Sequence, residues 1–168
     1  MLCNKTVKIT FCGHRDVIEY NAVYKELLST LEQFFILSEY NGTLLEFYCG
    51  GYGTFDSMCS KAISELKEKY PKSNIKKLLI TPYITKSHQE KIDSMRKNYD
   101  EVVFPPLETV PLKFAIPERN KWMVERADLI LCCIEREKGG AWQTVRYAMK
   151  QGKDVINLAN DDEAVNLL

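Results

Sequence analysis

The sequence lacks a surplus of charge of either sign. Lys and Arg together number 23, and Asp and Glu also number 23, so the formal net charge is zero. Proteins that bind the phosphate backbone of nucleic acid usually carry a basic surplus. The composition therefore argues against nucleic acid as a partner. A local basic patch at residues 61–72 or 72–77 is the alternative, although solvent-facing helix surface explains these lysines more simply.

The sequence also lacks long apolar runs and paired cysteines. No segment approaches the roughly 20 apolar residues that a membrane helix needs, and Asn4 and Lys5 interrupt any apolar run at the start. We therefore expect neither a membrane anchor nor a leader. The six cysteines form no C-x-x-C pair and no zinc-finger spacing with His14 or His88. We expect a cytoplasmic protein with reduced thiols, no metal and no cofactor, in which Cys49 is the one candidate for a reactive thiol.

What the sequence does contain is a regular alternation of strand and helix patterns. The expected strands are 7–12, 44–48, 77–81, 101–104, 128–134 and 154–158, and the expected helices are 17–40, 56–70, 86–99, 117–127 and 141–151. Residues 108–117 have no clear period and predict a loop. This alternation indicates parallel βαβ units with right-handed crossovers. The prediction is one doubly wound, Rossmann-like α/β domain over residues 1–168, with a mostly parallel sheet.

Residues 34–37 place four apolar side chains in a row, Phe-Phe-Ile-Leu, within the expected helix 17–40. This exceeds what one helix face usually buries, so part of the surface is expected to meet a second copy of the chain. Burial of all four residues within a single domain is the alternative.

A glycine-rich segment at residues 49–56, Cys-Gly-Gly-Tyr-Gly-Thr-Phe-Asp, joins a predicted strand to a predicted helix. Glycines let the backbone bend sharply and approach a ligand closely. The following helix directs its unpaired N–H groups and the positive end of its dipole at this point, which favours phosphate. We therefore predict that Gly50, Gly51, Gly53 and Thr54 hold a phosphate. A purely structural turn is the alternative.

Two side chains of this segment suggest further contacts. Asp56 stands where the dinucleotide fingerprint has its third glycine, and the segment follows the second strand, which argues against a nicotinamide dehydrogenase. Because a carboxylate repels phosphate, Asp56 is explained by a sugar hydroxyl, by a developing positive centre, or simply by helix capping. Tyr52 is a candidate to stack on a base.

Polar and glycine-rich segments follow two other predicted strands. The candidate ligand contacts in these segments are Gly13, His14, Arg15, Gly139, Gly140 and Thr144. Ligands of such sheets bind beyond the carboxyl ends of the strands, so we expect these residues to share a pocket with the glycine-rich segment. Arg15 suits a bidentate phosphate contact, and Thr144 belongs to a second helix mouth for a phosphate or a base. Caps, an ion pair with Asp16 and a flexible loop are the alternatives.

Four motifs occur in an order that resembles a known superfamily. They are residues 11–15 (Phe-Cys-Gly-His-Arg), the segment 50–56, residues 117–123 (Pro-Glu-Arg-Asn-Lys-Trp-Met) and residues 139–141 (Gly-Gly-Ala). Together they resemble the SLOG superfamily, a Rossmann-like group that includes the Lonely-Guy phosphoribohydrolases and the DprA DNA-processing proteins. The chain looks most like the small stand-alone YpsA-like branch. The resemblance implies a nucleotide-derived ligand at the glycine-rich segment, with Arg119 and Asn120 as further contacts.

One position departs from the Lonely-Guy pattern. Those enzymes place a catalytic glutamate where this sequence has Ser57, and Asp56 is the only carboxylate on the turn. Hydrolysis of an N-glycosidic bond needs a carboxylate to stabilise an oxocarbenium-like centre or to activate water. The leading hypothesis is therefore a binding protein or sensor for a nucleotide-derived small molecule. In it, Arg15 and Arg119 neutralise phosphate and Asp56 contacts ribose.

Two alternatives stay open. One is an N-glycosidase, a deoxyribosyltransferase-like or a phosphoribohydrolase-like enzyme with Asp56 as its catalytic residue. The other is a protein-interaction module in which the pocket is vestigial.

Overall fold

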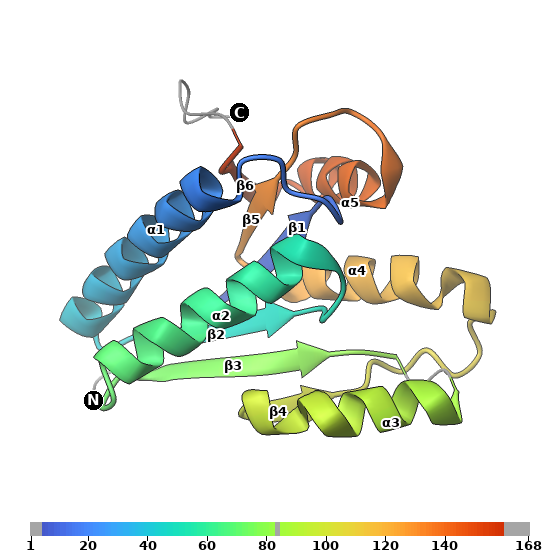
Figure 1. Ribbon diagram of the computed structural model, residues 1–168, viewed down its shortest axis with the longest axis horizontal. Helices are drawn as coiled ribbons and strands as arrows, with labels where there is room; N and C mark the ends of the chain where they lie inside the picture. The colour runs from blue at the N-terminus through green and yellow to red at the C-terminus, as the bar shows by residue number, and fades with distance from the viewer. Residues whose placement is uncertain (1–4, 83–84, 160–168) are drawn as a thin grey trace.

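The computed structural model describes residues 5–82 and 85–159, which form a six-stranded sheet with helices on both faces (Figure 1). The strands are β1 (Thr6–Gly13), β2 (Leu44–Cys49), β3 (Ile75–Ile80), β4 (Glu101–Val103), β5 (Leu129–Cys133) and β6 (Asp154–Asn157). The helices are α1 (Tyr20–Asn41), α2 (Gly53–Lys69), α3 (Lys86–Met95), α4 (Ala115–Arg126) and α5 (Gly139–Lys150), with the short 3-10 helices η1 (Arg96–Asn98) and η2 (Leu112–Phe114). The predicted Rossmann-like α/β fold is confirmed. Both ends of the predicted domain 1–168 lie outside the described residues.

The strand order reverses between β1 and β5. The order across the sheet is β4-β3-β2-β1-β5-β6, and every neighbouring pair is parallel. Helices α1, α2 and α3 cover one face, and α4 and α5 cover the other (Figure 1). Ligands of doubly wound sheets bind beyond the carboxyl ends of the strands at such a reversal. The fold therefore places the segments after β1, β2 and β5 at one edge of the sheet.

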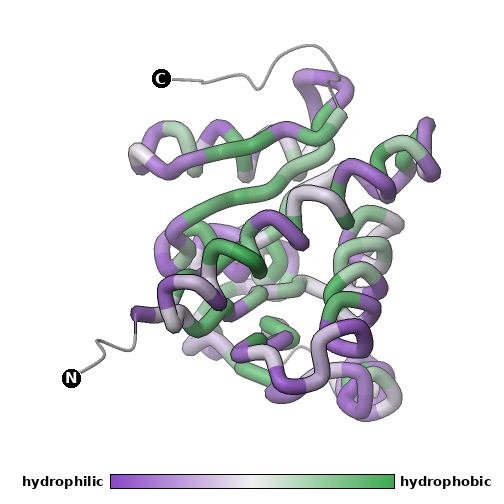
Figure 2. Tube along the Cα trace, turned by 90° about the vertical axis from the view of Figure 1, so that its left-hand side faces the viewer, coloured by the Kyte–Doolittle hydropathy of each residue, from purple (hydrophilic) through white to green (hydrophobic). Residues whose placement is uncertain are grey.

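The apolar core forms one layer on each face of the sheet. Beneath α1 and α2, Leu27, Phe47 and Ile63 are fully buried. On the opposite face, Ile130 and Ala148 pack between β5 and α5. Figure 2 shows hydrophobic residues along the strands and an alternation of hydrophilic and hydrophobic residues along the helices. This alternation is the amphipathic pattern from which the helices were predicted.

The helix ends follow local chemistry. Gly42 closes α1 with a φ of 62°, which is the left-handed conformation that glycine adopts at helix ends. Helix α2 begins at Gly53 rather than at residue 56, so the glycine-rich segment supplies its first turn. Helix α4 begins at Ala115, two residues before Pro117, and η2 occupies part of the predicted loop. Proline is tolerated there because first-turn N–H groups have no acceptor within the helix.

Helix α1 divides its apolar residues between core and surface. Phe35 is buried and Phe34 packs against the same core, whereas Ile36 and Leu37 are exposed. The contact of this exposed pair with a second copy of the chain stays a prediction. Neither α1 nor any other helix in the described part of the chain combines the length and the apolar character needed to cross a bilayer.

Two glycines offer a test of the packing. A methyl group on Gly13 would lie 2.4 Å from the ring of Phe55, so we expect Gly13→Ala to lower the free energy of unfolding by about 1–3 kcal/mol. Gly140, in the first turn of α5, has open space around its Cβ position. We expect Gly140→Ala to be neutral or to stabilise the fold by up to about 1 kcal/mol. Urea denaturation measures both changes, and equal stabilities of the two variants would contradict this packing.

Candidate functional site

The segments that follow β1 and β2 pack directly on one another. The Thr54 N–H donates to the Arg15 carbonyl oxygen at 3.0 Å, and a Cβ on Gly53 would lie 3.3 Å from the Arg15 Cα. Gly51 and Gly53 have φ values of 75° and 85°, which glycine adopts without strain. The Arg15 side chain is exposed at this junction, beside the first turn of α2. The Thr54 N–H is thus engaged within the protein, and Arg15 is held at the N-terminus of a helix.

A buried arginine lies beneath the glycine-rich segment. Arg119 extends from α4 and is only 2% exposed. Its Nη1 donates to the carbonyl oxygens of Gly50 at 2.6 Å and Ile80 at 2.9 Å. A Cβ on Gly50 would lie 2.4 Å from Nη1, so only glycine fits there. Arg119 therefore supports the segment from below and joins the ends of β2 and β3, rather than facing solvent as a phosphate contact would.

The carboxylate of Asp56 lies over the same glycine. Its Oδ2 accepts a hydrogen bond from the Tyr52 N–H at 3.0 Å and would lie 2.9 Å from a Cβ on Gly50. Burial raises the pKa of Asp56, and the nearby Arg119 guanidinium opposes that shift. Asp56, the fourth residue of α2, thus accepts from the N–H of the N-cap residue Tyr52 and also places a carboxyl group beside a buried cation.

Tyr52 packs against α3. Its hydroxyl lies 2.9 Å from His88 Nδ1, and the two rings stack with centroids 5.9 Å apart. Two cations lie near the Tyr52 ring, Lys91 Nζ at 4.9 Å and Arg119 Cζ at 5.3 Å from its centroid. Thr81 Oγ1 lies 3.1 Å from His88 Nε2. Burial lowers the pKa of His88, which favours the neutral ring in this contact.

The N-terminus of α5 is tied to β1 and α4. The Cys12 thiol donates to a carbonyl in the first turn of α5 at 3.1 Å. Asn120 Nδ2 donates to Thr144 Oγ1 at 3.3 Å, and Thr144 Oγ1 donates to the Gly140 carbonyl at 2.9 Å. Gly139 and Gly140 are exposed, with open space at their Cβ positions. The predicted contacts Asn120 and Thr144 therefore bond to each other, while the two glycines leave the helix mouth uncovered.

The remaining predicted residues lie in the interior. His14 is buried, and its Nε2 has no hydrogen-bond partner among the described residues, so a ligand or water would satisfy it. Burial raises the pKa of Cys49, which keeps its thiol protonated and makes it a core residue. In the part of the chain that the structure describes, no group of His, Cys, Asp and Glu is arranged to hold a metal ion.

The structure brings the predicted residues together in two neighbouring groups. The first contains Arg15, the glycine-rich segment and Arg119, and the second joins Asn120 to Thr144. Cys12 lies next to the second group, because its thiol donates to a carbonyl in the first turn of α5, and burial raises its pKa to about 12. A third group of residues, Thr81, His88 and Lys91, was not predicted from the sequence. Thr81 follows β3 directly, so the rule of strand ends would have found it, whereas the other two lie in a helix with no motif.

Comparison with known proteins identifies relatives of the fold. No protein-family model matches the chain, and no curated protein matches it. The chain is similar to DNA processing protein A (DprA) from Streptococcus pneumoniae, with a TM-score of 0.60 and 19% identity over 90% of this chain and 50% of that one. It is also similar to DprA from Helicobacter pylori, with a TM-score of 0.57 and 16% identity over 93% of this chain and 66% of that one.

The chain therefore has a DprA-like fold and spans half the length of the first of these proteins. The Helicobacter pylori structure concerns the way in which that protein binds single-stranded DNA. The prediction that argued against nucleic acid as a partner is wrong, because a protein of this fold binds DNA. A net charge of zero does not exclude nucleic acid, because it sums over the whole chain, whereas phosphate contacts depend on the charges near one site.

Arg119 makes a sharp test of how the site is held. Replacing it with Leu leaves the carbonyl oxygens of Gly50 and Ile80 without their donor in a buried position, so we expect Arg119→Leu to cost about 3–5 kcal/mol of unfolding free energy. Arg146 is exposed on α5, and we expect Arg146→Leu to cost less than about 0.5 kcal/mol. Chemical denaturation compares the two variants. A small loss in both would show that the Arg119 contacts contribute little.

The raised pKa of Asp56 predicts a pH dependence of stability. The folded protein holds the Asp56 proton more tightly than the unfolded chain does, so this stabilisation is present at low pH. It is lost as the pH rises from the ordinary value of 3.8 through the folded pKa. We expect Asp56→Asn to lessen the fall in unfolding free energy above about pH 4. Urea titrations at a series of pH values measure the slope, with Asp93→Asn, an exposed carboxylate on α3, as the control. If unfolding free energy falls with pH as steeply in Asp56→Asn as in the wild type, Asp56 is not the source of this pH dependence.

Proposed function

We propose that the chain binds a nucleotide-type ligand at the strand reversal between β1 and β5. The observation that carries the proposal is the contact between the Thr54 N–H and the Arg15 carbonyl, which holds the backbone of an exposed arginine at the N-terminus of α2. A helix N-terminus and a guanidinium each favour an anion. Held side by side, they act on the same phosphate group.

Asp56 is the proposed contact to the sugar. Its Oδ2 is oriented by the Tyr52 N–H, and a carboxyl group in this position can accept a hydrogen bond from a ribose or deoxyribose hydroxyl. Arg119 acts beneath it as a positioning residue, because it holds the Gly50 carbonyl on which the turn depends. The sugar and the phosphate of one nucleotide would then be recognised from α2 and from the segment after β1.

The ligand class is a phosphate linked to a sugar, either a small nucleotide derivative or single-stranded nucleic acid. The order of the four sequence motifs supports the YpsA-like branch and a small molecule. The likeness to the Helicobacter pylori protein supports single-stranded DNA. Both ligands would present a phosphate group to Arg15 and a sugar hydroxyl to Asp56.

A second candidate function is hydrolysis or transfer at an N-glycosidic bond. The observation that favours it is the raised pKa of Asp56 beside a buried guanidinium, because shifted carboxyl groups gather at catalytic sites. In this function Asp56 would act as the catalytic carboxylate on the sugar.

Native mass spectrometry of the chain with a ligand panel tests the proposal. The panel contains mononucleotides, nucleoside diphosphate sugars, ADP-ribose, cyclic dinucleotides and a single-stranded oligothymidylate. We expect a stable adduct with at least one member, and we expect Arg15→Ala to weaken it about tenfold or more, because a charge-assisted hydrogen bond is lost. Arg146→Ala removes an exposed arginine further along α5 and should keep wild-type affinity.

The pattern of adducts separates the candidates. An adduct with the oligonucleotide that weakens steeply with salt identifies nucleic acid as the ligand. Release of free base by the wild type, with binding but no release by Asp56→Asn, identifies the glycosidase. No adduct from any member, or full affinity in Arg15→Ala, would overturn the proposal and favour an interaction module with a vestigial pocket.

A further inference from the structure

A cleft of about 350 Å³ opens on the face of the sheet that α2 covers. Small-molecule sites have volumes of this order. Its polar lining comes from α2, β3 and the end of η1, and it includes Ser57, Ser60, Ser64, Lys77, Asn98 and Tyr99. We name it the Lys77 cleft, after the lysine in its wall. It lies beside the glycine-rich segment, since Gly51 also borders it.

Lys77 is a buried cation. It lies on β3 between Ile75 and Leu79, which are buried residues of the same strand face, and it is itself only 3% exposed. Lysine is almost never fully buried unless it is paired. Burial lowers the pKa of Lys77, as expected for an ammonium group taken out of water.

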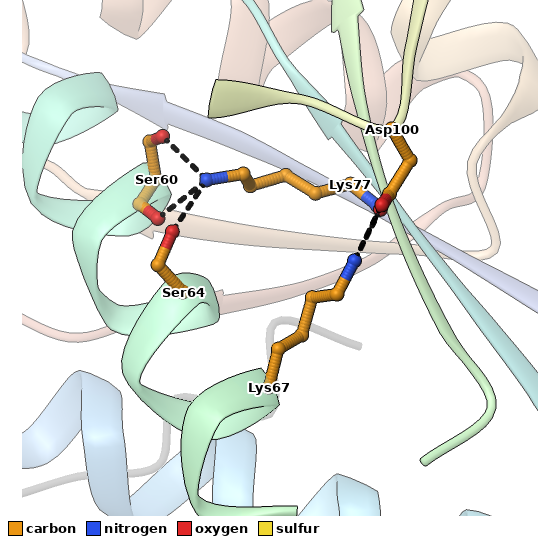
Figure 3. Close-up of polar contacts among 5 residues, drawn as sticks. All are labelled: Ser60, Ser64, Lys67, Lys77 and Asp100. Atoms are coloured by element: carbon orange, nitrogen blue, oxygen red, sulfur yellow. Dashed lines mark hydrogen bonds and ion pairs between the residues drawn. The ribbon is translucent and has the colours of Figure 1, made fainter. Parts of the chain in front are cut away.

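Hydroxyl groups, not carboxylates, surround the Lys77 ammonium (Figure 3). Nζ donates to Ser64 Oγ at 2.6 Å, to Ser60 Oγ at 3.2 Å and to the Ser60 carbonyl at 3.1 Å. The Tyr99 ring centroid lies 5.0 Å away. Within residues 5–82 and 85–159, no carboxylate forms an ion pair with Nζ. The ammonium protons therefore have acceptors, but the positive charge is not neutralised.

The neighbouring carboxylate is already engaged. Asp100 accepts from the backbone N–H of Lys77 at 2.7 Å and from Lys67 Nζ at 2.6 Å. Figure 3 shows the Asp100 carboxylate between Lys67 and the Lys77 backbone, at the opposite end of the Lys77 side chain from its ammonium. Asp100 thus forms its ion pair with Lys67, and it acts on the Lys77 ammonium only as a nearby charge, without direct contact.

The hydroxyl protons of Ser60 and Ser64 are not used in their contacts with the Lys77 ammonium. Ser60 and Ser64 are one turn apart on α2, so their hydroxyls face the same side of the helix. Each hydroxyl oxygen accepts from the Lys77 ammonium, which leaves its proton available. In the described part of the chain no other residue accepts from Ser64 Oγ. The Ser60 hydroxyl also contacts the Tyr99 side chain: burial raises the pKa of Tyr99, and this contact opposes the rise. The wall of the cleft thus combines two O–H donors with a buried, unneutralised cation.

We propose that the Lys77 cleft is a second ligand site, which binds a small organic phosphate through Ser60, Ser64 and Lys77. The phosphate oxygens accept hydrogen bonds from the two hydroxyls. The phosphate also supplies the negative counter-charge that the buried Lys77 ammonium lacks. The volume of the cleft exceeds that of a phosphate group, so it also holds the organic part of the molecule. This site is additional to the proposed nucleotide site, whose residues are Arg15 and Asp56.

Lysine side-chain NMR tests this site directly. Inorganic phosphate is titrated into the chain labelled with ¹³C-lysine, and the Lys77 Cε signal is assigned by its loss in Lys77→Met. We expect this signal to shift saturably. The signal of Lys76, an exposed neighbour on the same strand, should not follow it. The double variant Ser60→Ala/Ser64→Ala should weaken phosphate binding about tenfold or more, because two hydrogen bonds to a charged group are lost.

Three results would overturn the proposal. They are an unmoved Lys77 signal at saturating phosphate, an unchanged titration in the folded serine double variant, and an equal saturable shift with acetate in place of phosphate. Lys76→Met is the matched charge control and should keep the phosphate response. The nucleotide proposal is tested by a different measurement, the adducts of the wild type and of Arg15→Ala. Failure of either proposal therefore leaves the other standing.

Discussion

The buried guanidinium of Arg119 is the interaction on which the candidate site depends. It extends from α4, on one face of the sheet, to the carbonyl oxygens at the ends of β2 and β3. Because a guanidinium is planar and its donors point in fixed directions, two carbonyl contacts hold the strand ends in one position relative to α4. Burying the charge costs free energy, and these hydrogen bonds together with the nearby Asp56 carboxyl offset that cost.

Among the described residues, an arginine and a lysine are buried in different surroundings. Arg119 lies among backbone carbonyls with Asp56 nearby, whereas Lys77 lies among serine hydroxyls and an aromatic ring. The planar donors of arginine suit fixed backbone acceptors, and the compact charge of lysine suits a mobile counter-ion. The first cation therefore supports the backbone of the candidate site, while the second lies in the wall of a cleft. Gly51, which borders the cleft, connects the two regions.

Most of the fold could be predicted because buried strands and amphipathic helices carry their periods in the sequence. The starts of the helices were predicted less accurately. Helix α2 begins at Gly53 rather than at residue 56, because the residues of its first turn do not extend the periodic pattern of apolar residues. Strand-end reasoning located Arg15, Gly50 and Asp56, since it depends only on the order of elements. It could not locate His88, because its partner Tyr52 lies 36 positions away in the chain.

The sequence by itself determined the order of the elements and the positions that require glycine, because both depend on residues close along the chain. Only the tertiary structure decided which charged side chains are buried. From the sequence, Lys77 was interpreted as a solvent-facing lysine and Arg119 as a contact to phosphate. Their burial arises from carbonyls and hydroxyls that separate elements bring together. The free energy of a charge depends on what surrounds it in space, and that surrounding is assembled only when the sheet and its helices pack.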